Sequence, residues 1–211
     1  MDHRPFTDDL DFLEHEVAWV EARCRHLAAV RDHEQDEQHH AHRQVSCCRR
    51  RNTAEGEVPE DLASLRQVEE DIRTEIDARI AATETAGGTL GLQKLVWDLD
   101  LDTADRNPLL LALIPCLGTR ATDPLERIGT YGMCGAVAAE VVAVFNEFGF
   151  AERLKRLRFT TNHKLVEAGI VTTDTADDAD PGDWPNTSLK LSLKGWTALT
   201  GLQPTAARDL P

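Results

Sequence analysis

Apolar side chains recur every three or four positions in two stretches of the first half of the chain. The first stretch holds Leu13, Val17, Val20, Cys24 and Leu27, and the second holds Leu62, Leu65, Val68, Ile72, Ile76 and Ile80. This period places the apolar residues of each stretch on one face of an α-helix. Asp8 or Asp9 can cap the first helix, and the residues between the stretches are polar. We therefore predict two long helices, paired as an antiparallel hairpin over residues 1–86.

Both apolar stripes are narrow, and this leaves two interpretations of the hairpin open. In one, the two helices cover only each other. In the other, the stripes also meet a second chain, as in a coiled coil.

Gly87 and Gly88 follow the second stripe and mark a predicted domain boundary. A helical segment is expected over residues 87–149, and it contains three predicted helices. The first spans residues 90–101. The second is almost wholly apolar. Asn107-Pro108 can cap and open it, although the resemblance described below favours an earlier start, and Pro115 should bend or end it. The third is amphipathic and spans residues 133–148.

The order of elements changes over residues 150–211. Short helices are predicted at residues 151–157 and 162–168, strands at 170–173 and 187–193, an acidic loop at 174–183, and a closing helical turn at 194–199. In the second strand, Leu189, Leu191 and Leu193 alternate with polar residues and predict one buried face. Helix, helix, strand, long hairpin loop and strand is the order of a winged helix. The predicted fold class is mainly α, with a long helical hairpin, a compact helical segment and a C-terminal winged-helix (α+β) module.

Composition excludes several classes of protein. The 211 residues carry a formal net charge of −14, and no apolar run is long enough to cross a membrane. The first residues lack the basic-then-apolar pattern of a secretory signal. The five cysteines are odd in number and show no CxxC spacing, which argues against a disulfide framework. We expect an acidic cytoplasmic protein that does not bind membranes.

Motifs for catalysis or cofactor binding are missing from the sequence. It contains no GxxxxGK[ST], and the glycine cluster at residues 87–91 lacks the lysine of a phosphate loop. Asp98, Asp100 and Asp102 lack the glycine and distal glutamate of a calcium loop, and His163 is expected to cap or flank a helix. No residue is assigned to catalysis, to a cofactor or to a metal, so the chain is not expected to be an enzyme.

One stretch is rich in side chains that can bind metals. It contains His33, His39, His40, His42, Cys47 and Cys48. Imidazole and thiolate bind zinc, nickel and copper well, but this spacing fits no zinc finger. A solvated surface is the favoured interpretation, and a metal-handling protein stays open as a third function.

Charge also bears on nucleic-acid binding, which many winged helices perform. Five bases cluster before the predicted strands, namely Arg153, Lys155, Arg156, Arg158 and Lys164. The predicted wing beside them, residues 174–183, carries five aspartates and no base. Such a wing would repel phosphates, so recognition of proteins is favoured over recognition of DNA.

Three segments resemble the N-terminal region of AAA+ ATPases that accompany phage-tail-like contractile injection systems. Glu16-Val17-Ala18-Trp19 resembles an early "E-x-A-W" helix of that region. Residues 99–117 resemble its leucine-rich helix, in which an acidic-Arg pair precedes three leucines and a proline follows. Asp105-Arg106, Leu109 to Leu111 and Pro115 match, whereas Pro108 and Cys116 depart from the pattern. Residues 189–202 resemble the last strand and turn before the ATPase core.

The resemblance implies a non-catalytic region that selects protein partners or substrates, while an ATPase core beyond Pro211 would hydrolyse ATP. A homo-oligomer is compatible with it. The alternative is a dimeric winged-helix transcription regulator in which residues 8–84 form the dimerisation hairpin.

Overall fold

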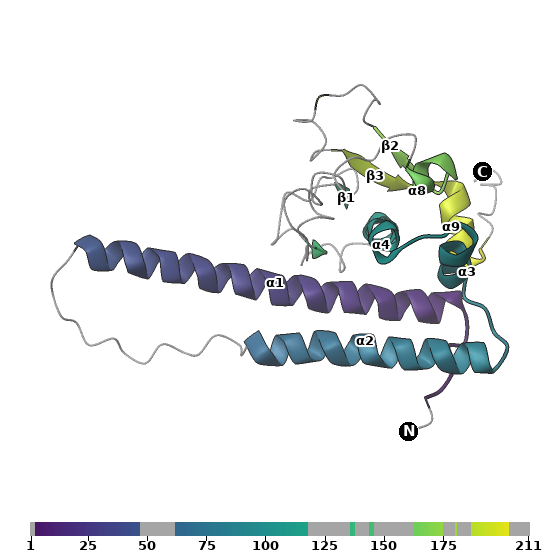
Figure 1. Cartoon of the computed structure of the whole chain (residues 1–211), viewed down its shortest axis with the longest axis horizontal. Helices are drawn as coiled ribbons and strands as arrows, with labels where there is room; N and C mark the ends of the chain where they lie inside the picture. Colours follow the sequence, from purple (N-terminus) through teal and green to yellow (C-terminus); the bar gives the residue numbers. More distant parts are fainter. Residues whose placement is uncertain are drawn as a thin grey trace, which may run out of the picture.

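The computed structural model describes residues 3–46, 62–117, 136–137, 144–145, 163–174, 180 and 187–202. Two long antiparallel helices form one side of the molecule, and the shorter elements pack on the other side (Figure 1). These two helices are α1 (Asp9–Ser46) and α2 (Leu62–Thr85), and α1 continues well past the start of α2. The predicted helical hairpin is confirmed.

The start of α1 is set by side-chain capping. The carboxylate of Asp8 accepts a hydrogen bond of 2.8 Å from the amide of Asp11, as expected for an aspartate at this position. The segment before the helix is tied to the end of α2, because the Phe6 amide donates to Thr83 Oγ1 at 2.9 Å. The hairpin is therefore joined at the end opposite its connecting loop.

α1 is covered on two sides, by α2 and by the helices of the rest of the chain (Figure 1). Leu13, Val20 and Cys24 of the predicted stripe are buried, and Phe12 and Glu16, outside that stripe, are fully buried too. The buried surface of α1 is therefore wider than the stripe of apolar residues from which the helix was predicted. The extra surface is covered from within the chain.

On α2, the prediction placed Val68 on the buried face, and this is wrong. Val68 is 50 % exposed, whereas its neighbour Glu69 is buried. The Glu69 carboxylate accepts hydrogen bonds from Arg23 at 2.6 Å and from His26 at 3.0 Å, both on α1. These charged bonds turn Glu69 inward, and Val68 faces outward as a result.

The helical segment contains α3 (Gly91–Asp98) and α4 (Thr103–Leu117). α3 ends earlier than predicted. α4 begins at Thr103, not at Asn107-Pro108, and so has the earlier start that the resemblance favoured. Asp102 caps it, because the Asp105 amide donates to Asp102 Oδ1 at 2.8 Å. The helix continues through Pro115 to Leu117, so this proline does not end it.

The described part of the C-terminal module has the predicted winged-helix order, and the fold class is confirmed. It contains α8 (Lys164–Glu167), β2 (Val171–Thr173), β3 (Ser188–Leu191) and α9 (Leu193–Thr200). β1 (Ala136–Val137), which comes before residue 150, adds a third strand. The three strands form an antiparallel sheet in the order β1-β3-β2. α4 packs against this sheet.

Two predictions in this part are corrected. Ala136–Val137 is a strand, although a helix was predicted over residues 133–148, because these residues pair with β3. Leu193 is 64 % exposed and not on a buried strand face, because Ser192 accepts a hydrogen bond from the Gly195 amide and starts α9. The predicted helix at residues 151–157, and most of that at 133–148, lie outside the described residues.

Buried residues from both sides of the predicted boundary form one core. It contains Leu109 to Ile114 of α4 together with Phe12 of α1, Ile76 of α2, Leu189 of β3 and Leu199 of α9. The division into residues 1–86, 87–149 and 150–211 stays a prediction. Within the described part of the chain, no helix combines the length and the apolar character needed to cross a membrane.

Candidate functional site

Of the five basic residues considered for DNA binding, only Lys164 lies among the described residues. Its Nζ donates to the backbone carbonyl of Asp100 and lies 3.7 Å from carboxylate oxygens of both Asp100 and Asp105. This ammonium is therefore engaged by two acids of the chain itself. Arg153, Lys155, Arg156 and Arg158 lie outside the described residues.

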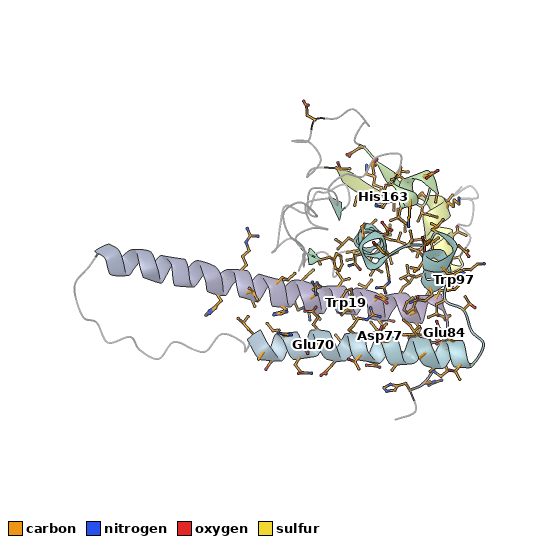
Figure 2. All side chains as sticks on the ribbon, viewed as in Figure 1. Trp19, Glu70, Asp77, Glu84, Trp97 and His163 are labelled. Carbon is orange, nitrogen blue, oxygen red and sulfur yellow. The ribbon has the colours of Figure 1, made fainter. Side chains whose placement is uncertain are left out.

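His163 caps α8, as its position in the sequence predicted. Its Nδ1 accepts a hydrogen bond of 3.3 Å from the Leu165 amide, and its Nε2 lies 3.6 Å from Asp105 Oδ1 (Figure 2). Burial lowers the pKa of His163 below its ordinary 6.5, and this effect exceeds the opposing influence of Asp105. The neutral imidazole is the form that caps the helix.

The described residues of the predicted acidic loop are Asp174 and Asp180, and both are exposed. Asp174 Oδ1 accepts a hydrogen bond of 2.8 Å from the Ser188 amide, so this carboxylate joins the ends of β2 and β3. The start of the wing therefore carries negative charge.

The aspartates considered as a metal loop serve other roles. Asp98 ends α3, Asp100 adopts a left-handed backbone with φ of 50°, and Asp102 caps α4. No group of three or more potential metal ligands occurs among the described residues. His33 is exposed. For the remainder of the predicted histidine-rich stretch, the side chains of His39, His40 and His42 and all of Cys47 and Cys48 lie outside what is described.

A buried polar junction joins the hairpin to α4. Glu16 of α1 is 0 % exposed. Its carboxylate accepts hydrogen bonds from Arg73 of α2, at 3.2 and 3.3 Å, and from Arg106 of α4. The Arg73 guanidinium lies 5.4 Å from the centre of the Trp19 ring. Glu16 and Arg106, which belong to different motifs of the resemblance, therefore bond directly, and Trp19 contacts Arg73, the other partner of Glu16.

Burial and charge act differently on the two arginines of this junction. Burial lowers the pKa of Arg106, and Glu16 only partly opposes it. Burial acts on Arg73 in the same direction, but hydrogen bonds and charges from Asp77 and Glu16 raise its pKa overall. Arg106 Nε has no hydrogen-bond partner among the described residues. Both guanidinium groups bond to the one Glu16 carboxylate, which indicates a structural role for this junction.

The sequence held a signal for this junction that the prediction did not use. Glu16 lies three positions after Leu13 and four before Val20, so the helical period itself places it on the inner face. A charged residue on that face needs a partner. Arg73, on the other helix, could not be chosen from the sequence alone.

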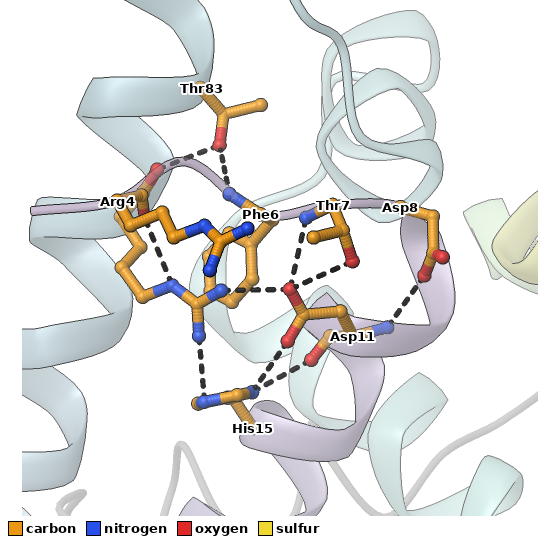
Figure 3. Close-up of polar contacts among 8 residues, drawn as sticks. Arg4, Phe6, Thr7, Asp8, Asp11, His15 and Thr83 are labelled. Atoms are coloured by element: carbon orange, nitrogen blue, oxygen red, sulfur yellow. Dashed lines mark hydrogen bonds and ion pairs between the residues drawn. The ribbon is translucent and has the colours of Figure 1, made fainter.

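A second polar cluster holds the N-terminal segment against the hairpin (Figure 3). Arg79 donates to Asp11 Oδ2 at 2.7 Å and to His15 Nε2 at 2.8 Å, and its guanidinium lies 4.0 Å from the centre of the Phe6 ring. Burial would raise the pKa of Asp11, but hydrogen bonds from Thr7 and the charge of Arg79 lower it overall. The cluster contains no group left for a ligand, since each side chain bonds to its neighbours.

The described surface also contains a groove between the end of α2 and α3, with a volume of about 310 Å³. We call it the Trp97 groove. Trp97 forms part of its wall and is 86 % exposed. Figure 2 shows Trp97 on α3 and Glu84 near the end of α2, at the same end of the molecule. The prediction missed this residue, although Trp97 lies off the apolar face formed by Leu92, Leu95 and Leu99.

Comparison with known proteins agrees with the fold. Residues 1–209 match the family described as winged helix domain, variant. No curated protein and no solved structure is similar enough to the chain to count as a match. The family match covers almost the whole chain, including the helical hairpin, and by itself carries no link to AAA+ ATPases. This chain is a member of the variant winged helix domain family.

Proposed function

We propose that this winged-helix chain binds a protein partner and has no catalytic activity. We further propose that it serves a cytoplasmic AAA+ ATPase of a contractile injection system as its N-terminal, partner-selecting region. Winged helices act in DNA binding or in protein interaction, so the first question is which of these roles the surface supports.

The observation that carries the proposal is the state of Lys164. A lysine that neutralises a DNA phosphate must present its ammonium to solvent. The Lys164 side chain is 47 % exposed, but its ammonium bonds to the carbonyl of Asp100 and lies 3.7 Å from the carboxylates of Asp100 and Asp105, whose negative charge offsets its own. The described residues of the wing, Asp174 and Asp180, add exposed negative charge to the same module. A protein partner suits this surface better than a polyanion.

The buried junction supports the connection to AAA+ ATPases. Glu16 and Trp19 belong to one motif of the resemblance and Arg106 to another, and they are separated by almost 90 positions. Glu16 nevertheless bonds to Arg106 in the folded chain. Two motifs that form one contact are stronger support for the resemblance than either motif alone.

DNA binding is tested by fluorescence anisotropy with labelled duplexes at moderate salt. We expect no specific complex, and any non-specific affinity no tighter than about 100 μM. The Lys164→Glu variant should behave like the wild type, because this lysine is already engaged. Salt-sensitive, sequence-specific binding that is lost in R156E/R158E would contradict the proposal and favour the dimeric regulator.

The connection to an ATPase has separate tests. Calorimetric titration of the chain with Mg-ATP should give no binding heat, because the proposal places ATP binding in a separate ATPase core. Micromolar affinity for ATP would contradict this. The coding sequence after Pro211, or a neighbouring gene, should encode a phosphate loop with its lysine. Failure of this second test would remove the ATPase connection and leave the protein-binding role standing.

A further inference from the structure

The Trp97 groove has a largely apolar lining, and none of its lining residues is used in the argument for the proposed function. Leu90 is buried, and Ile80 and Val96 are half-buried against the core. Because these side chains are anchored in the core, the groove is a feature of the folded chain. Its volume of about 310 Å³ is enough for one large side chain.

The same face that carries this hollow also carries a protruding group. Trp97 is 86 % exposed, the largest exposed fraction among the large apolar side chains of the described residues. Transfer of an indole ring from water into an apolar groove is favourable in free energy. The face therefore presents both a projecting side chain and a site that could receive one.

The charges at the groove also have both signs. Glu84 of α2 and Lys94 of α3 line it, and both are exposed. Neither forms an ion pair with another described residue. Although the whole chain has a net charge of −14, these two groups balance each other locally. A groove lined by acids alone would suit a basic partner. This groove carries one acid and one base, so it does not select for a basic partner.

We propose that the Trp97 groove docks a second copy of this chain in a two-fold arrangement. Trp97 of each copy enters the groove of the other, and Glu84 of each copy faces Lys94 of the other. A two-fold interface requires one patch that is complementary to itself, and a projecting indole beside a groove with one charge of each sign meets this requirement. This inference does not depend on the ATPase connection.

The size of the groove sets the expected strength of the contact. One indole and one ion pair per copy fall well short of the roughly 1,600 Å² that stable interfaces bury. We therefore expect reversible association with a dissociation constant of about 10–500 μM. The measurement belongs at about 0.15 M salt, where the Debye length of roughly 8 Å screens the repulsion between two acidic chains.

Sedimentation equilibrium of the full chain, from about 10 μM to about 1 mM, tests the proposal. The average mass should rise with concentration from that of one chain towards that of two. The Trp97→Ala variant should remain monomeric across this range while its thermal midpoint stays unchanged, because the side chain is exposed. Leu193→Ala is the matched control: it removes another exposed apolar residue, 64 % exposed, and should leave association unaltered.

Charge reversal distinguishes a second copy from any other occupant. E84K places two bases at the groove, and K94E places two acids there. Each variant alone should associate at least about tenfold more weakly than the wild type, because like charges face each other across the two-fold axis. Mixing E84K with K94E should restore association as a heterodimer, and the double variant E84K/K94E should restore the homodimer.

Several outcomes would overturn the proposal. A wild type that stays monomeric up to about 1 mM has no such interface. A dimer that persists in Trp97→Ala uses another face of the molecule. A dimer that Trp97→Ala abolishes, but that neither the mixture nor the double variant restores, contradicts the pairing of Glu84 with Lys94. None of these results depends on whether the chain binds DNA, ATP or a foreign protein, so they leave the proposed function unaffected.

Discussion

Glu16 is the residue on which the joining of the hairpin to α4 depends most directly. Its side chain is fully buried, and a carboxylate removed from water is stable only with charged partners. Arg73 and Arg106 supply them from two different helices. Removing Glu16 leaves Arg106, which is 13 % exposed, without its partner, whereas Arg73 retains Asp77.

We predict that Glu16→Ala destabilises the chain by about 3 kcal/mol, at the lower end of the range for breaking a buried ion pair, because Arg73 is partly solvated. Chemical denaturation measures the change in the free energy of unfolding. Glu14→Ala, at an exposed position two residues before Glu16 on α1, should change it by less than about 0.5 kcal/mol. Equal effects of the two substitutions would show that the buried junction adds no more to the free energy of unfolding than an exposed residue does.

His163 makes the stability of the chain depend on pH. Burial lowers its pKa in the folded chain below the ordinary 6.5, so folding favours the neutral imidazole. The stability that this provides is present above pH 6.5 and is lost as the pH falls below that value. We predict that the wild type loses more stability between about pH 7.5 and pH 5.5 than His163→Asn, which keeps a capping acceptor without titrating.

The measurement is urea denaturation of both proteins at several pH values. Parallel pH profiles for the two proteins would contradict a role for the imidazole. Comparison with the variant is needed because other groups of the chain also titrate in this range.

At the scale of elements, three helix ends meet at Gly91. Its amide donates to Asp9 Oδ1 of α1 at 2.6 Å, and a Cβ at this position would lie 2.5 Å from the Ala198 carbonyl and 3.0 Å from that of Leu199, both on α9. α3 can approach α1 and α9 only because residue 91 has no side chain. A glycine that follows Gly87 and Gly88 in the sequence looks like part of a flexible joint, but here it is a packing position.

We predict that Gly91→Ala costs about 1–3 kcal/mol, because backbone carbonyls cannot move aside as a flexible side chain could. Thermal and chemical denaturation measure the effect. Asp98→Ala, at the exposed end of the same helix, serves as the control and should change stability by less than about 0.5 kcal/mol. An unchanged Gly91→Ala protein would mean that α3 is less closely packed than the structure shows.

At the scale of the whole molecule, the hairpin and the winged helix share buried surface. α1 lies between α2 and α4, and Trp19 of α1 stacks on Phe145 with ring centres 5.9 Å apart. Separating the hairpin from the rest would expose Phe12 and the leucines of α4 to water. That exposure is unfavourable by roughly 25 cal/mol for each Å² of apolar surface.

We therefore predict one cooperative unfolding transition for the whole chain. Far-ultraviolet circular dichroism, dominated by the long helices, and the fluorescence of the four tryptophans, of which Trp19 and Trp196 pack against the core, should give the same midpoint in urea. Two separate transitions would support independent units at residues 1–86 and beyond. A single transition would show that the predicted boundary at Gly87 is a turn within one folding unit.

The family and the main elements could be predicted from the sequence because they depend on local patterns. Helical period predicted the hairpin, and the alternating pattern of residues 187–193 predicted the second strand of the wing, although β3 ends at Leu191. Contacts between distant residues could not be predicted in this way. β1 forms only because Ala136 and Val137 pair with β3, and Val68 is exposed only because Glu69 meets Arg23 and His26.

The amino-acid pattern alone predicted the two long helices, a cap at Asp8 or Asp9, the cap at His163 and the winged-helix order, since period and capping act within a few residues. Only the tertiary structure decided that α1 is covered on two sides, that Glu16 bonds to Arg106, and that Trp97 stands beside a groove. These features depend on which helices pack together. Packing is settled by the whole set of buried surfaces and buried charges, and not by any one stretch of the chain.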